Sequence, residues 1–325
     1  MNGRSEKEII SGNKMQEKLK ELPAIFSEFY YYMYSDKSYT TIEVYIRYVK
    51  EFAESVCEGK ITEDFYKSVT PLEVNKYFAN IKHKKVNGEY QSSGDSIRAT
   101  KWSALNTFFE FLNENNYVET NPVAKTKRPK VQDTPDVSYL TEEEIQGILK
   151  NVRKNASKKM KNRDLAILSL GFATGLRVSA LCQINISDID FDNNTIRVIE
   201  KGDKTCDIIF GFHVKRQLKL WLQDREEYFD SKDTDALFLS NFSKRITRYG
   251  VYEVIQKYSE GVTDKKVSPH VMRHSCATNL YEKTGDIYLC ASVLNHKNIS
   301  TTQRYAEISK NRKKEAASIL NDIVK

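Results

Sequence analysis

The sequence predicts a mainly helical protein of two domains, the second of which contains a small three-stranded antiparallel sheet. Its 325 residues suit two domains of roughly 150 residues each. Apolar residues recur at helical spacing over most of the chain, and this spacing gives way to the alternation typical of strands only between residues 184 and 210. In chain order we expect a variable lead-in at 1–21, a helical domain at 22–120, a linker at 121–137 and a second domain at 138–325.

Composition and charge narrow the class of protein. No apolar run approaches the roughly 18 residues that a membrane-spanning helix needs, and the start of the chain lacks the apolar segment of a signal peptide, so we expect no membrane partner. Lys and Arg exceed Asp and Glu by 51 to 44. This net charge of +7 favours a polyanionic partner such as nucleic acid, although a solvated lysine-rich surface would have the same composition.

The cysteines indicate the redox environment. The chain has five of them and none stands in a C-x-x-C pair. This pattern excludes zinc-ribbon and disulfide-framework proteins and favours a reducing cytoplasm.

Helical spacing begins three times in the first domain. It starts at Thr40, at Thr70-Pro71, where proline suits a first helical turn, and at Ile97. Between the second and third helices, Gly88 and Gly94 flank a stretch that we expect to be a polar loop. The aromatic residues of the third helix are spaced as a buried face, so we interpret them as core rather than as a surface on which bases stack.

Two basic segments follow. Three prolines interrupt residues 121–137, which predicts a stiff linker whose basic side chains suit a strap along a phosphate backbone or, equally, a solvated tether. Residues 151–163 hold six further Lys or Arg and no acid. The candidates for DNA contact in these two segments are Lys125, Lys127, Arg128, Lys130, Lys158 and Lys159.

The second domain begins with a predicted capping box of Thr141 and Glu144. A nearly all-apolar stretch at 164–173 predicts a buried helix that ends in the turn Thr174-Gly175-Leu176-Arg177. Helices are expected again from His213 onward. The predicted strands lie at 184–191, 195–200 and 206–210.

Two motifs combine arginine with groups that bind or protonate an anion. Arg177 stands at a helix start behind a glycine turn, where a guanidinium and backbone N–H groups together suit a phosphate. His270 and Arg273, three residues apart on a helix that Ser268 would cap, share one face. His270 and His274 could instead hold a metal, but the Glu of H-E-x-x-H is missing, so we expect no metal site.

Two further motifs place single reactive side chains on turns or short helices. Lys201 stands at the tip of the predicted hairpin, beside Gly202, which permits a tight turn. His296 follows Asn295, a residue suited to a left-handed helix end, and Tyr305 comes nine residues later. Each motif alone is commonplace, so the inference depends on their order.

Taken in order, these motifs resemble those of the tyrosine recombinase, or phage integrase, family. The matching features are Arg in a T-G-L-R turn, Lys in a β-hairpin, H-x-x-R, L-x-H and a Tyr nine residues later, between about Leu140 and Ile308. The segment 22–120 resembles more loosely the family's SAM-like core-binding domain. The resemblance therefore implies a helical, DNA-binding N-terminal domain and a mixed α+β catalytic domain, as in two-domain Xer-like enzymes.

The family's activity is site-specific recombination through a 3′-phosphotyrosyl intermediate, in integration or excision of a mobile element or in resolution of multimers. It requires neither ATP nor a metal, so the resemblance implies no cofactor. The roles that it implies are Tyr305 as nucleophile, Arg177 and Arg273 as phosphate ligands, His270 as acid/base, His296 as a further donor and Lys201 as acid for the leaving 5′-oxygen.

The resemblance also implies double-stranded DNA as partner and assembly into dimers or tetramers on DNA, with or without accessory proteins. The amphipathic segment 309–325 would join the subunits, although it could equally pack on its own domain.

Two positions depart from the family pattern. Ala180 stands where R-x-x-E has Glu, and Asn295 replaces the Gly of L-G-H, a smaller change because Asn tolerates a left-handed backbone. The loss of a buried acceptor at position 180 leaves open a DNA-binding architectural or regulatory protein that no longer cleaves. A second alternative is an enzyme similar to type IB topoisomerases, which would use the same cleavage chemistry without synapsis.

Overall fold

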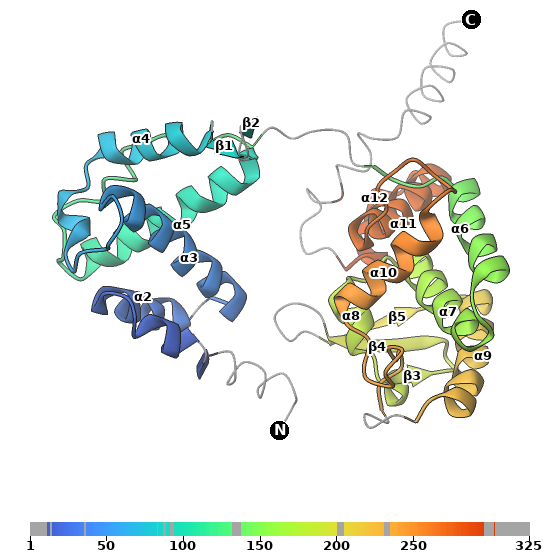
Figure 1. Ribbon diagram of the computed structural model, residues 1–325. Coiled ribbons are helices and arrows are strands. Elements are labelled where there is room, and N and C mark those ends of the chain that lie inside the picture. The colour runs from blue at the N-terminus through green and yellow to red at the C-terminus, as the bar shows by residue number, and fades with distance from the viewer. Residues whose placement is uncertain are drawn as a thin grey trace, which may run out of the picture. The chain divides into compact units, whose positions relative to one another are not determined.

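The computed structural model describes residues 12–13, 15–35, 37–82, 84–86, 89–91, 94–131, 138–199, 205–230, 235–295 and 302 (Figure 1). The chain divides into two compact units, residues 1–133 and 134–325, which are described separately.

The first unit is built mainly of helices. The helices are α2 (Ala24–Tyr34), α3 (Tyr39–Val56), α4 (Pro71–Lys82) and α5 (Asp95–Glu114). A short 3-10 helix, Phe65–Ser68, lies between α3 and α4, and α5 contacts α2, α3 and α4.

Aromatic rings fill the core of this unit. The ring of Phe108 on α5 stacks on that of Phe65, with centroids 5.9 Å apart, and meets the ring of Phe29 edge-on at 5.0 Å. Phe29, Phe52, Phe108 and Phe109 are fully buried. The prediction that the aromatic face of the third helix belongs to the core is confirmed.

A small hairpin joins α4 to α5 where the sequence predicts a polar loop. Strand β1 (Lys84–Val86) pairs antiparallel with β2 (Glu89–Gln91), Lys84 opposite Gln91. Three residues per strand are too few to show the alternation by which longer strands are found in a sequence.

The second unit combines helices with a three-stranded antiparallel sheet, which confirms the predicted fold class. The sheet has the order β3–β4–β5 and contacts α8, while α7 contacts α6, α9 and α11 (Figure 1). The elements are α6 (Glu142–Asn155), α7 (Lys158–Thr174), α8 (Val178–Gln183), β3 (Ile189–Asp190), β4 (Thr195–Ile199), β5 (Thr205–Ile209), α9 (Phe212–Tyr228), α10 (Arg248–Ser259), α11 (Pro269–Thr284) and α12 (Ile287–Val293).

The first strand of the sheet is shorter than the predicted strand at 184–191. The carbonyl of Ile184 accepts from the N–H of Leu237 at 2.9 Å, and the N–H of Ile186 donates to the carbonyl of Asp235 at 2.8 Å. The start of the predicted strand therefore pairs with residues 235–237, and only Ile189 and Asp190 reach β4.

A buried ionic network ties α7 to α10. Asp164 accepts from Nε of Arg163 at 2.8 Å and from the hydroxyl of Tyr258 at 2.9 Å, and Arg163 also donates to the carbonyl of Leu239 at 3.0 Å. Both charged side chains are buried. Burial, reinforced by the neighbouring carboxylate, raises the pKa of Tyr258, so the phenol is protonated and donates at neutral pH.

The network predicts an ordered series of stability losses. Tyr258→Phe removes one hydrogen bond and should lower the free energy of unfolding by about 1–3 kcal/mol. Asp164→Ala leaves a buried guanidinium without its carboxylate and should cost about 3–5 kcal/mol. Urea unfolding followed by Trp221 fluorescence, in a Trp102→Phe background, measures both. Lys283→Ala, which breaks an exposed ion pair with Glu142, is the control and should change stability by less than about 1 kcal/mol; a similar loss in Asp164→Ala and in this control would contradict the prediction.

Candidate active site

The turn after α7 places Arg177 at the start of a helix. Gly175 ends α7 with φ +59°, in the left-handed region, and its N–H donates to the carbonyl of Gly171 at 3.0 Å. Thr174 Oγ1 donates to the carbonyl of Leu170 at 2.6 Å and stabilises the same helix end. Arg177 follows as the N-terminal cap residue of α8, with its side chain half-buried.

Arg273 is buried and joins two helix ends. It lies on α11, whose start is capped by Ser268 Oγ accepting from the N–H of Val271 at 3.3 Å. Its Nη1 donates to the carbonyl of Gly175 and its Nη2 to the carbonyl of Leu294, both at 2.6 Å, and the residue is 7% exposed.

These two hydrogen bonds bring together motifs that are far apart in the sequence. Gly175, which accepts from Arg273, stands two residues before Arg177 and 98 residues before Arg273. Leu294 stands two residues before His296. The fold thus brings the T-G-L-R turn, the H-x-x-R helix and the first residue of L-x-H, Leu294, to one guanidinium.

His270 lies one turn before Arg273 on α11, at the exposed start of the helix. The two side chains therefore differ in environment: the imidazole of His270 is exposed, whereas the guanidinium of Arg273 is buried.

Strand β5, which pairs antiparallel with β4, also contacts this site. Asn295 has the left-handed backbone that the L-N-H motif predicts, with φ 50°, and its Nδ2 donates to Sγ of Cys206 on β5 at 3.2 Å. Burial and the carboxylate of Asp207 raise the pKa of the Cys206 thiol, while the positive charge of Arg177 opposes them. The Cys206 thiol is therefore within the electrostatic influence of Arg177, and its sulfur accepts a hydrogen bond from Asn295.

A second thiol lies beneath the glycine turn. Burial raises the pKa of Cys276 to about 12, with the nearby charge of Arg273 opposing the shift, so this thiol is protonated and chemically inert at neutral pH.

The catalytic candidates Lys201, His296 and Tyr305 lie outside the described residues. Lys201 belongs to the connection between β4 and β5, and Thr302, three residues before Tyr305, is fully buried.

Lys158 and Lys159 lie at the other end of α7 from Arg177. The helix has 17 residues, so its ends are about 25 Å apart at 1.5 Å per residue. Nζ of Lys159 stands 4.3 Å from the ring centroid of Phe229 and that of Lys158 5.6 Å from the ring of Tyr228. The fold does not bring these two lysines to the arginine pair.

The other basic candidates belong to the first unit. Trp102 Nε1 on α5 donates to Oγ1 of Thr126 at 2.9 Å, and Val123 is fully buried in the aromatic core. The first part of the predicted linker is thus packed on α5. The exposed basic side chains along it are Lys125, Lys127, Arg128 and Lys130.

Among the residues that the structure describes, no group of three or more His, Cys, Asp or Glu is arranged to hold a metal ion. In the same residues, no helix combines the length and the apolar character needed to cross a bilayer.

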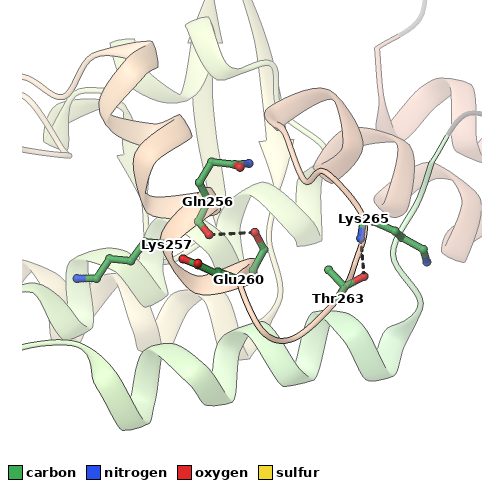
Figure 2. A pocket seen from close by; sticks show the side chains of 6 residues that line it. Gln256, Lys257, Glu260, Thr263 and Lys265 are labelled. Carbon is green, nitrogen blue, oxygen red and sulfur yellow. Dashed lines mark hydrogen bonds between the residues drawn. The ribbon is translucent and has the colours of Figure 1, made fainter.

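A polar pocket of about 420 Å³ lies away from these motifs, at the end of α10 and the loop that follows it (Figure 2). Lys265 at its edge donates to the carbonyl of Tyr139 at 2.8 Å and to Glu144 at 2.6 Å. These contacts fasten the start of the unit to the segment before α11.

Comparison with known families decides among the classes that the motifs allow. A profile of the phage integrase family matches residues 138–312, which include the T-G-L-R, H-x-x-R and L-x-H motifs. The chain belongs to the phage integrase family of tyrosine recombinases.

Relatives of this recombinase include two proteins described as tyrosine recombinase XerC. That of Anoxybacillus flavithermus is 30% identical over 285 residues, which cover 86% of this chain and 91% of the relative. That of Pediococcus pentosaceus is 34% identical over 221 residues, 66% of this chain and 72% of the relative. Family membership makes this chain a DNA breaking-rejoining enzyme of site-specific recombination, and neither alternative is favoured.

Solved structures share the fold. XerH recombinase in a post-cleavage complex with a palindromic difH substrate has a TM-score of 0.69 at 23% identity, covering 87% of this chain and 81% of the other. The Tn1549 transposon integrase in complex with transposon right-end DNA has a TM-score of 0.68 at 18% identity, covering 90% and 98%.

Ala180 of this recombinase lies on α8 and is 5% exposed. Its methyl group offers no hydrogen-bond acceptor where the family usually has a carboxylate. Two acceptors of Arg273 in this site are backbone carbonyls, those of Gly175 and Leu294.

Gly175 is the glycine on which this geometry depends. A Cβ there would stand 2.5 Å from Cδ2 of Leu294 and 3.3 Å from Sγ of Cys276. We expect Gly175→Ala to lower the free energy of unfolding by about 2–4 kcal/mol, from the left-handed backbone and from overpacking together, and to slow DNA cleavage because the carbonyl that orients Arg273 shifts.

The matched control is Gly261→Ala. Gly261 is also left-handed, with φ +71°, but nothing lies within 4 Å of its Cβ position. It should show only the backbone cost of about 1–2 kcal/mol and normal cleavage. Urea unfolding and cleavage rates test both variants, and equal effects at the two positions would mean that Gly175 has no special packing role.

Proposed function

We propose that this recombinase cleaves duplex DNA with Tyr305 as nucleophile and the arginine pair as the phosphate site. The observation that supports it most is the pair of hydrogen bonds from Arg273 to the carbonyls of Gly175 and Leu294. These bonds join the turn before Arg177 to the end of α12, which precedes His296. Four of the side chains that such a reaction needs therefore come from segments that Arg273 joins: Arg177, His270, Arg273 itself and His296.

In the cleavage step the phenol oxygen of Tyr305 attacks the scissile phosphorus while its proton passes to a base. The bond between phosphorus and the 5′-oxygen breaks, and the departing oxygen takes a proton from Lys201. The products are a 3′-phosphotyrosyl bond and a 5′-hydroxyl. When a 5′-hydroxyl attacks the phosphotyrosine, the phosphoryl group returns to DNA and each proton returns to the group that gave it. The phosphotyrosyl bond keeps the energy of the broken phosphodiester, so the recombinase needs no energy source to rejoin DNA.

The arginines stabilise the charge that grows on the phosphate during attack. A guanidinium presents planar N–H donors that match two phosphate oxygens, and fixed donors in a desolvated site are worth more than mobile ones in water. Arg273 meets this requirement because it is buried and held by two short hydrogen bonds. Arg177, at the start of α8, would bind the same phosphate together with the N–H groups of that helix start.

His270 and His296 complete the donor set. His270 at the exposed start of α11 would exchange the proton of Tyr305, and His296, next to Asn295, would donate to a phosphate oxygen. His270 stands three residues before Arg273, and His296 stands two residues after Leu294, whose carbonyl accepts from Arg273; these positions support the two roles.

Double-stranded DNA is the substrate class that this chemistry implies, and the solved relatives XerH and Tn1549 integrase are recorded in complexes with DNA. We assign residues 22–120 as a core-binding domain, 138–325 as the catalytic domain, and the segment 309–325 as the contact between subunits of a dimer or tetramer on DNA. A cytoplasmic location agrees with five cysteines that carry no predicted disulfide framework.

The first test is covalent capture. Full-length protein selects its site from a random-sequence duplex pool, and that site is then nicked close to the cleavage position so that the released fragment diffuses away. We expect a covalent protein–DNA adduct with wild type and none with Tyr305→Phe, which should still bind DNA. Tight binding without any adduct in wild type would instead favour the architectural alternative.

Salt dependence tests the two groups of lysines against each other. The exposed side chains of Lys125, Lys127 and Lys130 are candidates for phosphate binding, so replacing all three by Gln should lower the slope of log affinity against log salt by about 1 for each lysine that binds a phosphate in wild type. Lys158→Gln with Lys159→Gln is the matched control, because these side chains lie on aromatic rings about 25 Å from Arg177. An equal decrease of the slope in both variants would overturn the distinction.

A further inference from the structure

Asn295 makes a contact that the glycine usual at this position could not make. Its backbone is left-handed, and its own N–H donates to the carbonyl of Ser292 at 3.0 Å, a bond that glycine would keep. The side chain adds a second bond, from Nδ2 to Sγ of Cys206 at 3.2 Å. An Asn in this conformation is less favourable than Gly, so the side-chain contact is the feature that distinguishes this chain.

The contact reaches the edge of the sheet. In the order β3–β4–β5, strand β5 is the last strand, and Cys206 stands opposite Val198 of β4. β4 holds β5 along one side, and the bond from Asn295 holds it from the segment that follows α12. Five residues before Cys206 in the chain is Lys201, in the connection between these two strands.

The contact also adjoins the arginine site. The carbonyl of Leu294, immediately before Asn295, accepts from Arg273 at 2.6 Å. Arg273 is therefore connected to β5 by two hydrogen bonds, one to Leu294 and one from Asn295 to Cys206, which the backbone between residues 294 and 295 joins.

We propose that Asn295 is a positioning residue: it ties strand β5, which directly follows the connection that carries Lys201, to the Arg273 site, and through β5 it assists the step in which Lys201 acts. The inference rests on the proposed function, because it assigns Asn295 to the step in which Lys201 protonates the leaving oxygen. Asn295 itself does not touch the reacting atoms.

The experiment separates leaving-group protonation from the rest of catalysis. Cleavage is measured on the selected nicked duplex and on the same duplex with sulfur in place of the bridging 5′-oxygen at the phosphate that wild type cleaves. A thiolate leaves without being protonated, so a defect in the acid is repaired by this substrate and any other defect is not. Lys201→Ala is the reference variant, expected to be slow on the oxygen substrate and restored on the sulfur substrate.

We expect Asn295→Gly and Cys206→Ala each to slow cleavage of the oxygen substrate by about threefold to tenfold, as the loss of one hydrogen bond implies, and to cleave the sulfur substrate at the wild-type rate. The double variant should be no slower than either single one, because both remove the same bond. Asn295→Gly keeps the left-handed backbone, so it removes the contact and preserves the fold.

Asn194→Gly is the matched control. Asn194 has the same left-handed conformation, with φ 55°, in the turn before β4. It should leave both rates unchanged. Equal slowing of Asn295→Gly on both substrates, no slowing on either, or the same loss in the Asn194 control would each overturn the inference.

The proposed function and the role of Asn295 fail in different ways. If wild type forms no adduct, or if sulfur does not restore Lys201→Ala, the proposed function or its acid is wrong and the inference falls with it. If wild type cleaves and sulfur restores Lys201→Ala but not Asn295→Gly, only the role of Asn295 is wrong.

Discussion

The organisation of the second unit depends on one buried guanidinium at the meeting point of two helix ends. The carbonyls that Arg273 binds belong to Gly175 and Leu294, the residues that end α7 and α12. Carbonyls in the last turn of a helix have no partner within the helix and carry its partial negative charge. They therefore compensate a cation that would otherwise be too costly to bury, and the cation in turn fixes how the two helix ends meet.

Backbone conformation is what makes those carbonyls available. α7 ends in the left-handed Gly175, and α12 is followed by the left-handed Asn295. Each left-handed residue turns the chain sharply, and the carbonyls of Gly175 and Leu294 at these two turns both accept from Arg273. The same constraint explains why a side chain at position 175 has no room, since Leu294 and Cys276 fill the space beneath it.

Much of this arrangement could be predicted from the sequence, because it depends on local signals. The T-G-L-R turn, the Ser268 cap and the left-handed Asn295 follow from residue types whose backbone preferences are strong. The β1–β2 hairpin could not be predicted, because strands of three residues show no alternation. The bonds from Arg273 to two carbonyls could not be predicted either, because every residue has a backbone carbonyl and the sequence does not indicate which ones accept. Cys206 belongs to the same group: its sequence context indicates an ordinary core cysteine, and only the tertiary fold brings it to Asn295.

The same distinction separates the two kinds of acceptor that a buried guanidinium can have. A carboxylate that orients a neighbour is lost with one substitution, whereas a carbonyl is present whatever the side chain, provided that the backbone keeps its path. In this recombinase two of the acceptors of Arg273 are backbone carbonyls, those of Gly175 and Leu294. The constraint falls on the residues that hold the backbone in its left-handed turns, and Gly175 and Asn295 are the positions at which the geometry around Arg273 is decided.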